Sequence, residues 1–218
     1  MTVAVACEAY GEGLLGQPAN TVTSLAFVAA GIAVLAGRRG GTGRVSYALL
    51  VAAVGAGSLI QHGPYPDWQA YAHDLPMAAL LAFTAVDAAS DLTGRRLSQL
   101  WWLLPTAAMV LLVAVGPAAS TAAQVLLAGA AIGLNLARAR RRPLLRPAVI
   151  GALALLAAGS LAGTLGDRTS LCRPDTLLQG HAVWHVLAAA GLWWLAAAIG
   201  SRSHSGTDAS ARLRQDRV

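Results

Sequence analysis

Long apolar runs separated by short polar segments make up most of the chain. A membrane-spanning helix needs about 17–25 apolar residues, and seven runs reach that length. These runs cover residues 21–37, 45–62, 74–90, 100–116, 118–136, 147–166 and 180–199. Each run is continuously apolar, whereas barrel strands alternate apolar and polar residues over about ten positions. The pattern therefore predicts an all-α membrane protein, a bundle of seven transmembrane helices.

Glycine, proline and arginine interrupt the apolar runs and mark the expected loops. Examples are Gly94-Arg95-Arg96, Gly116-Pro117 and the arginine-rich segment 138–147. We predict an extracytoplasmic N-terminal segment over residues 1–20 and a membrane domain over 21–200. Residues 201–218 are rich in Ser, Arg and Asp, so we predict a disordered cytoplasmic tail in which His204 has no catalytic role.

The composition agrees with a membrane chain. Hydrophobic residues make up 56% of the sequence and charged residues only 12%, whereas about 25% of a typical soluble domain is charged. A net charge of +6 would be compatible with nucleic-acid binding if the arginines lay on one folded surface, but they lie between apolar runs. We therefore expect no nucleic-acid partner, and we exclude a disordered chain, a disulfide-rich miniprotein and a coiled coil.

The arginines set the expected orientation. The chain has 16 basic residues, and all of them are arginines. Fourteen fall in the tail or near the loops after the first, third and fifth runs; the exceptions are Arg168 and Arg173. Positive residues favour the cytoplasmic side, so we predict an outer N-terminus, a cytoplasmic C-terminus and residence in the plasma (cytoplasmic) membrane. The cytoplasmic arginine clusters, such as Arg138–Arg142, are expected to contact anionic lipids.

Polar side chains inside the apolar runs are few, and they gather at one end of the predicted bundle. Ser58 and His62 lie where the second run ends, His73 and Asp74 where the third begins. His181 and His185 open the seventh run and are four residues apart, so they share one helix face. Polar residues within a membrane usually face the bundle interior and serve function.

Three imidazoles from two helices form a plausible open zinc site, with His62, His181 and His185 as ligands. Other interpretations remain open at this point: a histidine near a helix end can be an ordinary interfacial residue, and an HxxxH pair can ligate haem. Ser58 can back-bond to the carbonyl of residue 54, and Asp74 can cap the third helix.

The motifs resemble those of the alkaline ceramidase family of seven-helix membrane hydrolases, in the superfamily that also contains adiponectin-receptor-like proteins. The resemblance covers nearly all of the membrane domain. It rests on Cys7-Glu8, Gln17-Pro18-Ala-Asn20-Thr21, Ser24-Leu-Ala-Phe27, Gly57-Ser58 with His62, Asp74-Leu-Pro76 and Gly180-His181-Ala-Val-Trp184-His185.

The resemblance implies a zinc ion held by the three histidines and hydrolysis of a lipid amide bond. Ser58 would hold the attacking water or the developing oxyanion, and Asp74 would be the general base. The lipid would enter sideways from the bilayer. The lipid's identity, the oligomeric state and whether the chain turns over any substrate stay open.

The chain departs from the family pattern at two places. Counted from His62, the family's aspartate position falls on His73, and Asp74 follows one residue later; we prefer Asp74 as the base, with His73 as a fourth ligand or the proton acceptor as the alternative. The family's acidic calcium-binding cluster is mostly absent around Glu8, which argues against bound Ca²⁺.

The two cysteines, Cys7 and Cys172, both fall on the predicted outer side, where we expect a disulfide similar to one known in the family; two free thiols are the alternative. The N-terminal segment with Gln17 and Asn20 is expected to cover the site; the alternative for Asn20 is a role as the N-cap of the first helix. The alternatives to a hydrolase are a noncatalytic receptor or scaffold with a structural metal and a haem-binding membrane protein.

Overall fold

The computed structural model describes residues 7–37, 41–98 and 100–201, and this part of the chain contains seven α-helices and no strand. The helices are α1 (Pro18–Ala36), α2 (Thr42–His62), α3 (Gln69–Thr93), α4 (Leu100–Val115), α5 (Pro117–Arg141), α6 (Arg146–Arg168) and α7 (Gly180–Leu195). A short 3₁₀ turn, η1 (Pro143–Leu145), joins α5 to α6. The all-α prediction is confirmed. The predicted tail beyond Ser201, with His204, lies outside the described residues.

Five helices are long and apolar enough to cross a membrane: α1, α2, α3, α5 and α6 with its preceding turn. α4 is apolar but only 16 residues long. Large apolar side chains point outward along the helices, among them Leu104, Leu111 and Leu126, which are 63%, 71% and 75% exposed. Such extensive apolar exposure fits a surface in contact with lipid.

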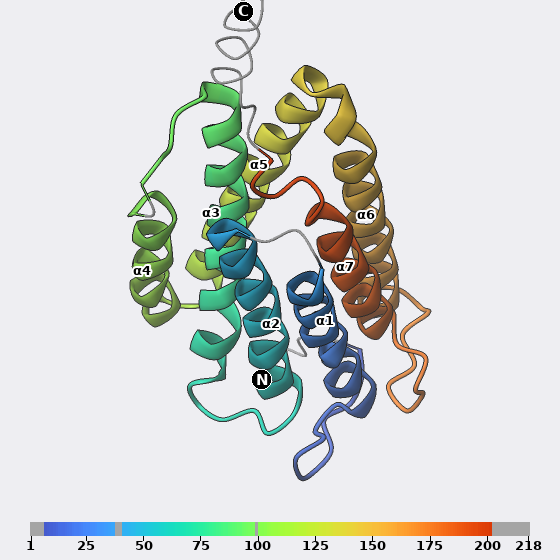
Figure 1. The fold of residues 1–218 in the computed structure, drawn as a ribbon. Coiled ribbons are helices and arrows are strands. Elements are labelled where there is room, and N and C mark those ends of the chain that lie inside the picture. Colours follow the sequence, from blue (N-terminus) through green and yellow to red (C-terminus); the bar gives the residue numbers. More distant parts are fainter. Residues whose placement is uncertain (1–6, 38–40, 99, 202–218) are drawn as a thin grey trace, which may run out of the picture.

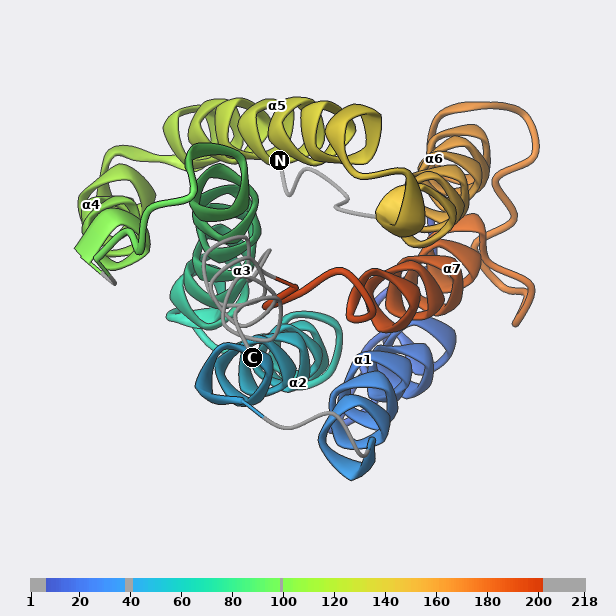
Figure 2. The same cartoon turned by 45° about the horizontal axis from the view of Figure 1, so that its top comes forward.

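The helices form a ring around which α1, α2, α3, α5, α6 and α7 follow one another, and α7 closes the ring against α1 (Figures 1 and 2). α4 lies outside the ring against α3 and α5. The C-terminus of α2 and the N-termini of α3 and α7 lie at the same end, which we call the histidine end. This arrangement brings residues more than 100 positions apart in sequence into one site.

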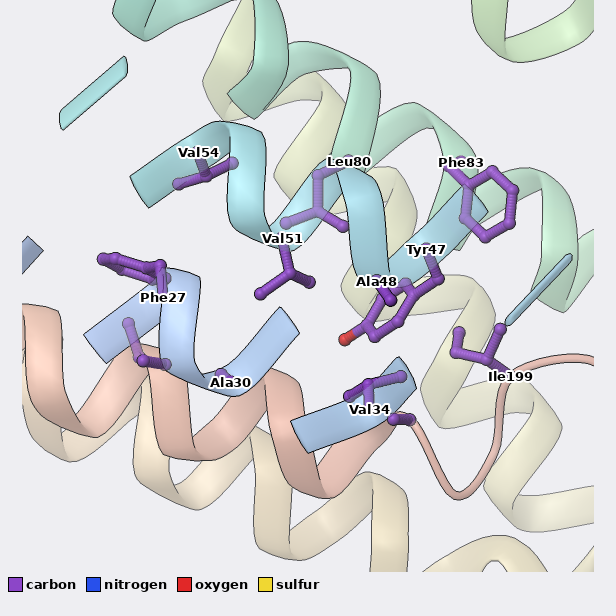
Figure 3. Packing of buried hydrophobic residues seen from close by; sticks show 13 residues of the cluster. Phe27, Ala30, Val34, Tyr47, Ala48, Val51, Val54, Leu80, Phe83 and Ile199 are labelled. Carbon is purple, nitrogen blue, oxygen red and sulfur yellow. The ribbon is translucent and has the colours of Figure 1, made fainter. Parts of the chain in front are cut away.

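The main core lies where α1, α2, α3 and the end of α7 meet (Figure 3). Tyr47 of α2 is fully buried there, near Phe83 of α3, and its hydroxyl donates a hydrogen bond to the carbonyl of Leu192 at 2.7 Å. A buried hydroxyl in an apolar core needs such a partner. The core thus fixes the C-terminal part of α7 against the N-terminal part of α2, away from the histidine end.

Two helix starts differ from the prediction. α3 begins at Gln69, five residues before the apolar run, so Asp74 lies inside the helix and is not its N-cap. α1 begins at Pro18, and the residue that precedes it is Gln17, so Asn20 is not an N-cap either. Apolarity marks the membrane-embedded part of a helix, whereas the helix itself continues into polar residues. The predicted end of α2 at His62, followed by Gly63, is confirmed.

The end opposite the histidine end carries a ladder of ion pairs between α3 and α5. Arg138 donates to Asp87 at 2.8 Å, and Arg142 pairs with Asp91 one turn further on. Arg138 is fully buried, which corrects the expectation that the whole segment 138–147 is a loop: α5 continues to Arg141 because Asp87 compensates the buried charge. Arg140 and Arg141 are exposed, and Arg141 donates a hydrogen bond to the carbonyl of Leu92 at 3.4 Å.

Candidate metal centre

Three histidines meet at the histidine end of the ring. The ring centroids of His62 of α2, His181 and His185 of α7 lie 4.8–5.0 Å apart in every pairing. One nitrogen of each ring lies within 4.8 Å of the others, close enough for one metal ion. His62 and His185 are buried, and His181 is partly exposed. The sequence prediction that these three side chains converge is confirmed.

Each imidazole is fixed through its Nδ1 atom, which leaves Nε2 available as a ligand. His62 Nδ1 lies 2.6 Å from Gln17 Oε1, His181 Nδ1 3.2 Å from Asp167 Oδ2, and His185 Nδ1 3.1 Å from the carbonyl oxygen of Asn20. Acceptors at Nδ1 select the tautomer whose Nε2 carries a lone pair, and metal-binding histidines are usually held in this way.

His62 Nε2 supplies a direct test of the metal interpretation. In the described part of the chain this nitrogen is buried and has no hydrogen-bond partner. An unpaired buried polar atom is costly, and a metal ion between the three rings would satisfy it. Three imidazoles with an open fourth position suit zinc, although other divalent transition metals also accept them. The residues present therefore fit a metal ion.

Asp167, at the end of α6, links the N-terminal segment to the histidines. One carboxylate oxygen accepts a hydrogen bond from the backbone N–H of Cys7 at 3.0 Å, and the other contacts His181. A disulfide joins Cys7 to Cys172 in the loop before α7, as predicted. The disulfide thus holds Cys7, which donates to Asp167, next to the loop that leads into α7 and His181.

Glu8 and Gln17, also in the N-terminal segment, hold the side chain of His62. The buried Glu8 carboxylate accepts hydrogen bonds from the backbone N–H groups of Ala19 and Asn20, so it caps the N-terminus of α1. The Gln17 amide donates to the Glu8 carbonyl and presents its oxygen to His62. Both Glu8 oxygens are therefore engaged as a helix cap.

Tyr10 closes the segment over the end of α2. Its hydroxyl donates to the carbonyl of Gln61 at 2.5 Å, and its ring contacts Tyr65 edge to face. Burial, with smaller contributions from Tyr65 and Glu8, raises the pKa of Tyr10, so the hydroxyl keeps its proton and remains a donor. The predicted covering role of the N-terminal segment is therefore built from specific contacts.

Ser58 lies between α1 and the histidines. Its hydroxyl is buried, 2.9 Å from Ser24 Oγ and 3.4 Å from His185 Nε2. Ser24 donates its own proton to the Asn20 carbonyl at 2.7 Å, so Ser58 is the donor to Ser24. The Ser58 oxygen consequently presents its lone pairs beside the Nε2 side of His185.

His73 and Asp74 form a pair on α3. His73 Nδ1 lies 2.9 Å from Asp74 Oδ1. Asp74 lies close to the side chains of Ser120 and Gln124 on α5, whereas His73 lies near His62 and His185. The two neighbours therefore face different parts of the bundle, as the 100° turn between consecutive helical residues requires.

Sequence reasoning missed the residues that orient the histidines, chiefly Asp167 and Thr23, whose hydroxyl lies 3.1 Å from His185 Nδ1. A signal for Asp167 was present. Gly166 and Gly180 allow α6 and α7 to touch, because a Cβ on Gly180 would lie 2.4 Å from the Ala162 carbonyl oxygen. Small residues at both positions indicate a close crossing, which places Asp167 next to His181.

Comparisons with known proteins add no assignment to this geometry: no protein-family model matches the chain, and no curated protein matches its sequence.

Proposed function

We propose that the protein is a zinc-dependent membrane hydrolase that cleaves the amide bond of a ceramide-like or other N-acyl lipid. The observation that carries the proposal is the set of three histidines, each anchored at Nδ1, around the unpartnered Nε2 of His62. The resemblance of the sequence motifs to alkaline ceramidases supplies the reaction class.

The residues around the histidines match the needs of amide hydrolysis. Zinc, when bound, would act as a Lewis acid toward the amide carbonyl and would make water nucleophilic near neutral pH. Ser58 would orient the attacking water by accepting a hydrogen bond from it, because its own proton is donated to Ser24. The His73–Asp74 pair supplies the proton acceptor, which afterwards returns the proton to the departing amine.

A lipid substrate suits the surroundings of the site. A surface groove between α1 and α7 is lined only by apolar side chains, including Ala26, Ala29 and Trp193. Val186, which also lines the groove, directly follows the ligand His185 in sequence. We place the acyl chain in this groove, with its carbonyl toward the three histidines.

We further propose that all seven helices cross the plasma membrane, with the histidine end outside and the C-terminus in the cytoplasm. The distribution of the arginines supports this orientation. The disulfide agrees with it, since disulfides persist in oxidising compartments. The exposed Arg140 and Arg141 would then face anionic lipid headgroups in the inner leaflet.

A lipidomic comparison tests the function. Membranes that contain the wild-type protein should lose an N-acyl amide lipid and gain its free fatty acid and amine, while membranes with the His181→Ala variant should not. Purified wild-type protein should then hydrolyse that lipid. Identical lipid profiles, together with bound zinc in the wild type, would instead favour the noncatalytic receptor or scaffold.

A further inference from the structure

We infer that His73 is the proton acceptor of this site and that Asp74 is a positioning residue that holds the His73 imidazole. The inference deepens the proposed hydrolase function and rests on it. From the sequence alone we prefer Asp74 as the base, with its carboxylate taking the proton; this inference assigns that role to His73.

The helix crossing places His73 beside the site. α2 and α3 touch at Gly57: a Cβ at this position would lie 2.0 Å from the Ala72 carbonyl oxygen and 3.1 Å from the Cα atom of His73. Ser58 follows Gly57, and His62 lies one turn further on the same helix. The backbone of His73 is thus fixed next to the turn of α2 that contributes two of the site residues.

The hydrogen bonds assign different tasks to the two side chains. Asp74 accepts a hydrogen bond from His73 Nδ1, and its side chain lies close to Ser120 and Gln124 on the α5 side. His73 has Nδ1 bound to the carboxylate, which selects the tautomer with a lone pair on Nε2. In the described residues no hydrogen bond occupies His73 Nε2, and the ring is 23% exposed.

His73 lies near both His62 of α2 and His185 of α7. An imidazole oriented by a carboxylate is a common general base, because the carboxylate fixes the tautomer and stabilises the imidazolium that forms.

The step balances without any further reactant. His73 Nε2 takes a proton from water while the water oxygen forms a bond to the amide carbonyl carbon. The same proton then passes to the nitrogen as the C–N bond breaks. The products are a fatty acid and a free amine, and His73 returns to its neutral form.

Variants of purified, zinc-loaded protein distinguish the two assignments, with Asp67→Asn as the control because Asp67 is exposed in the loop before α3. We expect His73→Gly to lower kcat by about 10²–10⁴-fold with zinc content unchanged, and added imidazole to restore part of the rate. Asp74→Asn should also lower kcat, because the amide can present an N–H to Nδ1 and favour the wrong tautomer, but added imidazole should not restore this loss.

A measurement that needs no turnover accompanies the kinetics. In ¹⁵N-histidine spectra, the His73 signal, assigned by its loss in His73→Gly, should show the Nδ1–H tautomer in the wild type and move toward the Nε2–H tautomer in Asp74→Ala. An unchanged tautomer would overturn the positioning role.

The remaining outcomes separate this inference from the function itself. An active wild type in which Asp74→Asn is inactive and His73→Gly is not would restore Asp74 as the base. Loss of zinc from His73→Gly would make His73 a fourth ligand. A zinc-loaded wild type that cleaves no amide lipid would instead contradict the hydrolase proposal, and the proton-transfer role of His73 would fall with it.

Discussion

The side chains that surround the three histidines explain the geometry of the site better than the histidines do alone. Gln17, Asp167 and the Asn20 carbonyl each engage one Nδ1 atom. Outer-shell partners of this kind set the tautomer and typically change metal affinity by 10–100-fold when they are removed. The composition of this outer shell therefore determines how tightly a metal is bound.

Asp167→Asn should weaken zinc binding by about 10–100-fold while leaving the fold intact, because the amide contacts His181 without a charge and can present an N–H to Nδ1. Competition with a zinc-binding dye measures the affinity. Asp175→Asn is the matched control, since Asp175 is an exposed acid in the neighbouring loop. Equal affinities in the two variants would contradict the orienting role of Asp167.

The convergence of the three histidines was predictable because polar residues within apolar runs are conspicuous. The sequence did not predict their partners, because those lie at helix ends and in the N-terminal segment, where polar residues are ordinary. Asp74 illustrates the same limit. The sequence shows that Asp74 follows His73, but it does not show which of the two side chains faces α5. That depends on how α3 is placed, and α3 begins five residues before the apolar run.

Among the elements, the crossing of α2 and α3 depends on the absence of a side chain at Gly57. We predict that Gly57→Ala destabilises the protein by about 1–3 kcal/mol, because the added methyl collides with the Ala72 carbonyl. Thermal unfolding in detergent measures the effect. Gly133→Ala on α5 is the control, since a Cβ there meets no atom within 4 Å; equal melting temperatures would contradict the close crossing.

The ion-pair ladder gives a second prediction for the elements. Removing one partner of a buried pair leaves an uncompensated charge, so Asp87→Asn should cost about 3–5 kcal/mol in the free energy of unfolding. Arg140→Ala, at an exposed position on the same helix, should change little. A double variant with Asp87→Asn and Arg138→Met should recover much of the loss; a loss no smaller than that of Asp87→Asn would contradict the pairing.

The positions of the helices were predictable from apolarity, and six of the seven predicted runs begin within four residues of an observed helix start. Which helices pack against one another was not predictable from apolarity. The ring order, with α4 outside and α7 packed against α1, depends on small residues and buried polar contacts that apolar runs do not reveal.

At the scale of the whole molecule, the Cys7–Cys172 disulfide connects the N-terminal segment to the loop before α7 and hence to the site through Asp167. Reducing it should lower the free energy of unfolding by about 2–5 kcal/mol and should also weaken zinc binding, because Cys7 no longer fixes Asp167. Calorimetry and zinc affinity with and without a reductant measure both effects. A change in stability with no change in affinity would contradict the connection to the site.

The account as a whole depends on one shared metal ion, so the zinc content of the purified protein tests it most directly. We predict about one zinc ion per chain in the wild type, without a Soret band in the visible spectrum. We predict none in His62→Ala, His181→Ala or His185→Ala variants that fold normally. A wild type without zinc, a haem spectrum, or zinc that persists after all three replacements would contradict the metal centre.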